Sequence, residues 1–104
     1  MNQEVFAALS DALARGEEVA LVTITSSTGS TPQRVGAKML VFADGRTVGT
    51  IGGGCGEADV IAAADDVAQS GVPRCIHVEL LDSIDSFSPA VCGGVMDIFV
   101  ERVP

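Results

Sequence analysis

The segment from Val19 to Thr25 restricts the fold more than any other part of the sequence. Its residues are Val, Ala, Leu, Val, Thr, Ile and Thr, which favour extended backbone and are apolar on both faces of a strand. A strand of this composition is stable only where both of its faces are covered. The segment therefore predicts a central strand of a sheet.

Further strands are indicated on both sides of a hairpin turn at Asp44-Gly45. This dipeptide favours a tight β-turn, and the segments before and after it are rich in β-prone residues. The predicted strands after the central one are residues 37–42, 47–51, 75–81 and 95–101, with a long loop over residues 82–94.

Two helices are predicted. The first is expected to be capped by Asn2 and to end at Arg15-Gly16, and the second runs from about Cys55 to Ser70. The residues at helical spacing that we expect to be buried are Val5, Phe6, Leu9, Ala12 and Leu13 on the first helix, and Val60, Ile61, Ala64, Val67 and Ala68 on the second.

These elements predict one small domain over residues 1–104. The fold class is α/β or α+β, with a mixed sheet of about five strands, a β-hairpin and two helices. Apolar residues make up 47% of the chain and charged residues 19%, which is the balance of a globular protein rather than a disordered one.

Charge and cysteine content exclude several classes of partner. Six basic residues against fourteen acidic ones give a formal charge of -8, which disfavours nucleic acid and anionic membrane surfaces. Neither a signal peptide nor a membrane-spanning apolar run is visible. Three widely spaced cysteines favour reduced thiols, so we expect a cytoplasmic protein.

Glycine is concentrated before the second helix, where five of the twelve glycines fall between Gly49 and Gly56. Such a segment can point successive N–H groups at an anion, and the following helix adds a partial positive charge. A tight crossing of helix and sheet is the alternative. Neither a dinucleotide fingerprint nor a P-loop fits, because Glu57 and Asp59 stand where the former needs Gly or Ala, and no Gly-Lys-Ser/Thr follows.

Cys55 lies within this segment, at the predicted start of the helix, where the helix dipole favours a thiolate. A thiolate can bind a soft metal, carry sulfur or act as a nucleophile, whereas a buried cysteine only packs. Cys92-Gly93-Gly94 repeats the pattern before the last strand. The two cysteines suggest one shared site.

Other polar residues allow two interpretations each. Arg34 and Lys38 bracket a loop and could hold an anionic ligand, or could form solvated ion pairs. Glu57 suits either a helix cap or proton transfer. Cys75 is expected to pack or to lie at a sheet edge, and Cys75-x-His77 is a weak zinc signal, so we expect His77 to be an ordinary strand residue.

With these residues, the sequence resembles the XdhC/CoxI family, accessory proteins for xanthine dehydrogenase and related molybdenum hydroxylases. One departure is Gly52, where many relatives have serine. A second is the end of the chain at Pro104, where many relatives continue into a Rossmann-like domain, so the chain is similar to the N-terminal module alone. The matching segments are Ser27 to Pro32 with Arg34 and Gly36 to Met39, then Gly49 to Glu57, and Cys92 to Gly94.

The resemblance implies a chaperone rather than an enzyme. It would bind the molybdenum cofactor (molybdopterin) transiently, support its sulfuration and deliver it to a molybdenum hydroxylase apoprotein. A cysteine desulfurase and a separate Rossmann-domain protein are further implied partners, and a homodimer is expected because a small sheet leaves an edge or face to cover. Cys55 and Cys92 would contact the metal or its sulfur, and the other expected cofactor-binding residues are Ser30, Arg34, Lys38, Gly52, Gly53, Gly54, Gly56, Gly93 and Gly94.

Two other classes of function fit the same residues. Cys55 and Cys92 could form a reversible disulfide or pass a persulfide, which requires their Cα atoms to lie within about 7 Å. Alternatively, the glycine segment alone could bind a phosphate or a nucleotide.

Overall fold

The structure is a computed structural model that describes residues 2–29, 34–51, 57–79 and 94–104. The long loop predicted over residues 82–94 therefore falls outside the described residues, except for Gly94. In chain order the elements are α1 (Gln3–Ala14), β1 (Val19–Thr28), β2 (Lys38–Phe42), β3 (Thr47–Gly49), α2 (Glu57–Ser70), β4 (Arg74–Glu79) and β5 (Val95–Val103).

The five strands form one sheet in the order β3-β2-β1-β5-β4. β1 lies in the middle, as its sequence predicts, and the predicted class of a small α/β domain with five strands and two helices is confirmed. All four pairings are antiparallel, whereas we expected a mixed sheet. β3 and β4 do run in the same direction, but α2 carries the chain between opposite edges of the sheet, so these two strands never pair.

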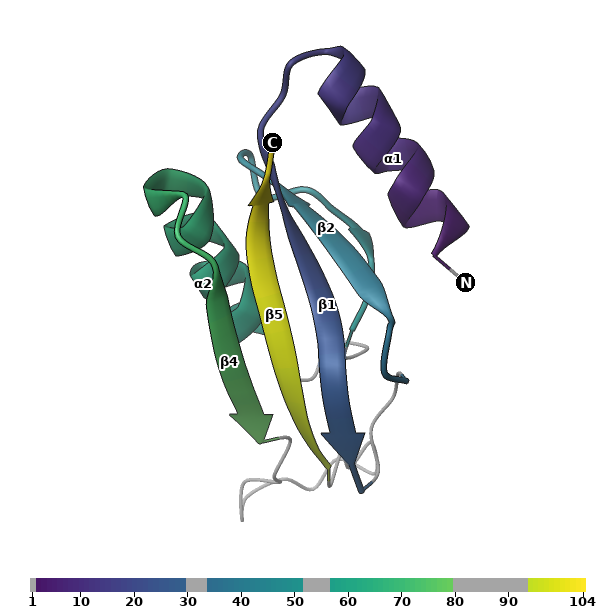
Figure 1. Ribbon diagram of the computed structural model, residues 1–104, viewed down its shortest axis with the longest axis vertical. Coiled ribbons are helices and arrows are strands. Elements are labelled where there is room, and N and C mark those ends of the chain that lie inside the picture. The colour runs from purple at the N-terminus through teal and green to yellow at the C-terminus, as the bar shows by residue number, and fades with distance from the viewer. Residues whose placement is uncertain (1, 30–33, 52–56, 80–93) are drawn as a thin grey trace.

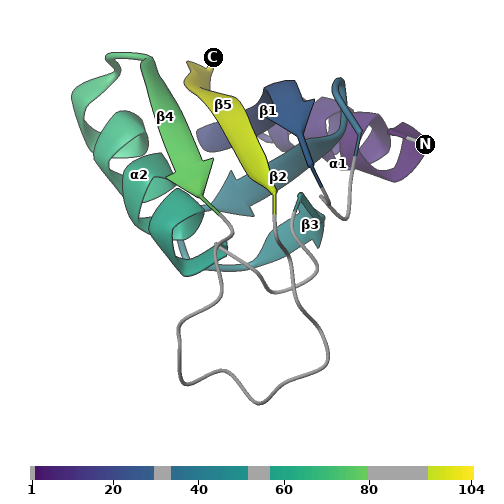
Figure 2. The same ribbon diagram turned by 90° about the horizontal axis from the view of Figure 1, so that it is seen from below.

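The two helices cover opposite faces of this sheet (Figures 1 and 2). α2 packs against β1, β4 and β5, and α1 packs against β2 and β3. Side chains alternate between the two faces along each strand, so β1 contributes to both cores. The α2 core includes Val22, Ile24, Met39, Val60, Val67 and Ile98, and the α1 core consists of Val5, Ala12, Val19, Leu21, Leu40 and Phe42.

The first helix differs from its prediction in two ways. Phe6 and Leu13 are 49% and 42% exposed, because the apolar arc of α1 is wider than the surface of the sheet that it covers. The Asn2 side chain does not cap the helix. Its Nδ2 donates to the Gly36 carbonyl oxygen at 2.9 Å, and its Oδ1 accepts from the Lys38 N–H at 3.2 Å. Asn2 therefore ties the start of α1 to the strand beneath it.

The predicted hairpin and second helix are confirmed. Gly45 adopts a positive φ of 91° in the turn between β2 and β3, where the Phe42 N–H donates to the Arg46 carbonyl at 2.9 Å. On α2 the predicted apolar stripe faces the sheet, with Val60 and Val67 fully buried. No helix within the described ranges is long and apolar enough to cross a membrane.

Candidate functional site

One end of the sheet collects the strand ends that border all three sequence motifs. Thr28, the last residue of β1, pairs with Val95, the first residue of β5, and Glu79 at the end of β4 pairs with the same valine. β2 starts and β3 stops toward the same end, where Met39 pairs with Gly49, but this pair is level with Val22, six residues before Thr28 on β1. α2 also begins on this side of the molecule, with its first turn toward the viewer in Figure 2. We call this end of the sheet the motif end.

Three of the predicted cofactor-binding residues are described by the structure. Arg34, Lys38 and Gly94 all lie at the motif end, and Gly94 is buried directly before β5. The others lie outside the described residues: Ser30, Gly52, Gly53, Gly54, Cys55, Gly56, Cys92 and Gly93. The antiparallel register brings the described borders of these segments together, although they are far apart in the sequence.

Arg34 and Lys38 have different surroundings. The Lys38 Nζ donates to the Thr23 hydroxyl at 2.9 Å, so this half-buried ammonium lies against β1. Arg34 is exposed, and its carbonyl accepts from the Ala37 N–H at 3.0 Å. Within the described part of the chain neither side chain forms an ion pair. Arg34 is therefore the more accessible of the two cations.

A polar cluster that the sequence analysis missed spans β1, β5 and β4. The Ser26 hydroxyl donates to Asp97 Oδ2 at 2.6 Å, and His77 Nδ1 lies 2.8 Å from Asp97 Oδ1. A β-bulge between Ile24 and Ser26 changes the phase of β1, so that Ser26 reaches the face that carries Asp97. Thr25 at the bulge donates its hydroxyl to the Asp97 carbonyl at 3.1 Å.

The cluster changes the ionisation of Asp97. The hydrogen bond from Ser26, followed by the one from His77, lowers the pKa of this carboxyl group. The cluster could not be found from the sequence, because Ser26, His77 and Asp97 form no local motif. Only the pairing of three strands brings them together. His77 is a surface residue of the edge strand, consistent with the prediction of an ordinary strand residue.

Cys75 lies on the same edge strand as an exposed free thiol, two residues from His77. Its predicted position at a sheet edge is confirmed. Among the residues that the structure describes, no group of three or more His, Cys, Asp or Glu side chains is placed to hold a metal ion.

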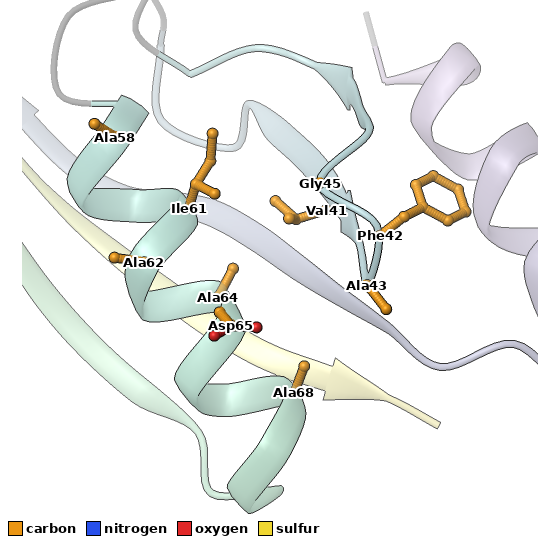
Figure 3. Close-up of a pocket in the computed structure, with 10 residues that line it drawn as sticks. All are labelled: Val41, Phe42, Ala43, Gly45, Ala58, Ile61, Ala62, Ala64, Asp65 and Ala68. Atoms are coloured by element: carbon orange, nitrogen blue, oxygen red, sulfur yellow. The ribbon is translucent and has the colours of Figure 1, made fainter.

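A cavity of about 370 Å³ lies between α2 and the β2–β3 hairpin (Figure 3). It begins at Ala58, in the first turn of α2, and extends along the helix to Ala68. Asp65 is its only charged lining residue, and its Oδ2 accepts from Gln69 Nε2 at 3.0 Å. The cavity is therefore largely apolar.

A sequence model of the XdhC and CoxI family matches residues 12–79, which is more than half of the chain. This chain belongs to the XdhC and CoxI family. The match runs from the last turn of α1 to the end of β4 and includes the segment that contains Cys55. The resemblance noted in the sequence is thereby confirmed.

Three relatives show where XdhC/CoxI domains occur. YqeB of Escherichia coli is 42% identical over 78% of this chain, and a probable xanthine dehydrogenase component of Bacillus subtilis is 33% identical over 84%. The crystal structure of a xanthine dehydrogenase from Bacillus halodurans matches 98% of the chain with a TM-score of 0.81 and 29% identity.

The XdhC/CoxI domain described here is much shorter than these relatives. It spans 15% of the E. coli protein, 27% of the B. subtilis protein and 31% of the B. halodurans chain. The B. subtilis and B. halodurans relatives carry xanthine dehydrogenase in their names.

Proposed function

We propose that this XdhC/CoxI domain binds the molybdenum cofactor transiently, assists its sulfuration and supports its insertion into a xanthine dehydrogenase-type apo-hydroxylase. One observation carries the proposal. The described borders of all three family motifs lie at the motif end, where the register pairs Thr28 and Glu79 with Val95 and pairs Met39 with Gly49. We therefore infer that residues on these three segments act on one ligand.

The residues present suit such a ligand. Thiolates are soft donors, so Cys55 and Cys92 would bind molybdenum or its terminal sulfur. The glycines around them would present backbone N–H groups to the phosphate of the pterin. When bound, the cofactor supplies a redox-active molybdenum centre for the client enzyme, whereas the chain itself only holds and orients it.

The two cations would act in different ways. Arg34 is exposed at the motif end and free of ion pairs with described residues, so it would meet a phosphate directly. Lys38 is held by the Thr23 hydroxyl, so we assign it a supporting charge at the rim. Ser30 would add a hydroxyl donor from the segment that precedes Arg34.

The proposed partners follow from this role. An apo-hydroxylase would receive the cofactor, a cysteine desulfurase would supply the sulfur, and a Rossmann-domain protein would be a further partner. The names of the B. subtilis and B. halodurans relatives support the first of these. We propose a cytoplasmic location and a homodimer on the grounds given by the sequence.

A thiol redox or persulfide-transfer protein is the second candidate function. It is favoured by the same convergence of segments, because Val95 follows Cys92 closely and Glu57 follows Cys55 closely at the motif end. Mass spectrometry after mild oxidation separates the two functions. A Cys55–Cys92 disulfide that forms and reduces reversibly supports redox chemistry, and its absence leaves cofactor binding.

Reconstitution of a client enzyme tests the proposed function. Purified apo-hydroxylase is mixed with released cofactor and a sulfur source, with or without the wild-type chain, and hydroxylase activity is measured. We expect a higher yield of active enzyme with the wild type and none of this gain with the Cys55→Ala, Cys92→Ala double variant. Cys75→Ala is the matched control, because this thiol is exposed on β4 outside the family motifs. An equal yield with and without the chain would contradict the proposal.

A further inference from the structure

We propose that His77, Asp97 and Ser26 form a proton-dependent clasp that holds the edge strand β4 to β5 and β1 near the motif end. The clasp rests on described contacts alone, and only its consequence for cofactor retention rests on the proposed function. His77 is the only histidine in the chain, so no second imidazole contributes to the effect.

Both ring nitrogens of His77 face a carboxylate. His77 Nδ1 lies 2.8 Å from Asp97 Oδ1, and His77 Nε2 lies 3.7 Å from Glu79 Oε1. Both ring nitrogens carry a hydrogen only in the imidazolium ion. A neutral imidazole would direct a lone pair at one of the two carboxylates. The geometry is therefore complete only when His77 is charged.

Asp97 is fixed independently of His77. Its Oδ2 accepts from Ser26 at 2.6 Å, and its carbonyl accepts from the Thr25 hydroxyl at 3.1 Å. Both donors depend on the bulge in β1, which turns Ser26 toward β5. Asp97 is thus a positioning residue, because β1 holds the carboxylate where the imidazole of β4 can reach it.

No other described charge competes at this position. On the same face, Cys75 is the neighbour on β4 and Glu101 lies further along β5. The Lys38 ammonium is bonded to Thr23 on β1, and α2 packs on the opposite face. Among the described residues, Asp97 and Glu79 are therefore the charged groups that interact with the His77 side chain.

The clasp acts where β4 has little other support. β4 is an edge strand, and β5 is its only partner in the sheet. Val78 is buried toward α2, but the opposite face of β4 carries only exposed side chains: Cys75, His77 and Glu79. Histidine ordinarily changes its charge between pH 5 and 8, so loss of the proton in this range weakens the contacts of His77 with Asp97 and Glu79.

Amide hydrogen exchange, measured by NMR at Val78 and Glu79 between pH 5.5 and 8, tests the clasp. After correction for the intrinsic rate, we expect protection in the wild type to fall about two- to fivefold as the pH rises, the effect of an exposed ion pair. His77→Gln should show no such fall, and Asp97→Asn and Ser26→Ala should each show a smaller one.

Glu101→Gln is the matched control for this experiment, because it removes a carboxylate from the same face of β5 without a contact to His77. It should keep the wild-type pH dependence. Protection that does not change with pH in the wild type, or a change that persists in His77→Gln, would overturn the clasp.

A second measurement links the clasp to the proposed function. The rate of cofactor release is compared at pH 6 and pH 8, and we expect faster release at pH 8 in the wild type and no His77-dependent difference in His77→Gln. Equal acceleration in both proteins overturns the link to the cofactor. A protein that retains no cofactor at either pH contradicts the proposed function, while the exchange experiment still decides whether the clasp exists.

Discussion

Gly49 lies so close to Val5 that a β-carbon at position 49 would stand 2.7 Å from the Val5 Cγ2 atom. The same β-carbon would stand 2.7 Å from the Lys38 carbonyl oxygen, and Gly49 has a φ of 81°. Gly49 ends β3, and its close neighbours belong to α1 and β2. The three elements therefore meet at this residue, shortly before the glycine-rich segment of the sequence. Gly49 is therefore required by packing as well as by backbone conformation.

Substitution of Gly49 by alanine should destabilise the domain by about 2 to 4 kcal/mol, because strain at positive φ and overpacking add together. Gly45 has a φ of 91° and open space around its β-carbon position, so Gly45→Ala should cost only about 1 to 2 kcal/mol. Denaturant unfolding measures both values. Equal losses in the two variants would show that the contact with Val5 has no energetic weight.

Asn2 provides a second test of how α1 is attached. Its side chain bonds to the Gly36 carbonyl and the Lys38 N–H, both half-buried, so Asn2→Ala should lower the free energy of unfolding by about 1 to 2 kcal/mol. Serine is a good helix cap but too short for both bonds. Asn2→Ser should therefore be as unstable as Asn2→Ala in the same unfolding experiment, whereas full rescue by serine would indicate that capping is the true role.

The ionisation of Asp97 predicts a specific response to acid. Ser26→Ala removes the larger cause of its lowered pKa, so the pKa of Asp97 should rise toward its usual value. A carboxyl group with a lowered folded pKa adds stability above its unfolded pKa of about 3.9 and loses it as the pH falls through the folded value. The stability difference between wild type and Ser26→Ala should thus be present at pH 6 and shrink as the pH falls below the unfolded pKa of about 3.9.

An NMR titration of side-chain carboxyl carbons measures this shift. Asp44 is an internal control, because its pKa is lowered by the backbone and side chain of Arg46, far from Ser26. Its midpoint should stay constant in Ser26→Ala. An unchanged midpoint for Asp97, or equal movement of both residues, would show that the Ser26 hydroxyl does not stabilise the charged form.

Local sequence predicted the elements that depend on local physics. The apolar residues of Val19 to Thr25 predicted the central position of β1, because a strand buried on two faces needs apolar side chains on both. Asp44-Gly45 predicted the hairpin, because its tight turn requires a residue that tolerates a positive φ. The buried stripe of α2, with Val60 and Val67, follows from helical spacing in the same way.

Features that depend on pairing between distant segments could not be predicted in this way. The sheet is antiparallel because α2 carries the chain from one edge of the sheet to the other, so that β3 and β4 do not pair. No local residue pattern shows how many strands the helix crosses. The contact of Lys38 with Thr23 and the cluster of Ser26, His77 and Asp97 both require the register of β1, and the cluster also requires its bulge. Asn2 looked like a cap because its tertiary partners lie more than thirty residues away.

Cofactor retention is the most direct test of the central claim that the motif end binds the molybdenum cofactor through Cys55 and Cys92. The wild-type chain is mixed with cofactor released from a molybdenum hydroxylase, passed over a sizing column, and assayed for molybdenum and pterin in the protein fraction. We predict that the wild type and Cys75→Ala retain both, and that the Cys55→Ala, Cys92→Ala double variant retains neither. Equal retention by the wild type and the double variant, or no retention by the wild type, would contradict the account.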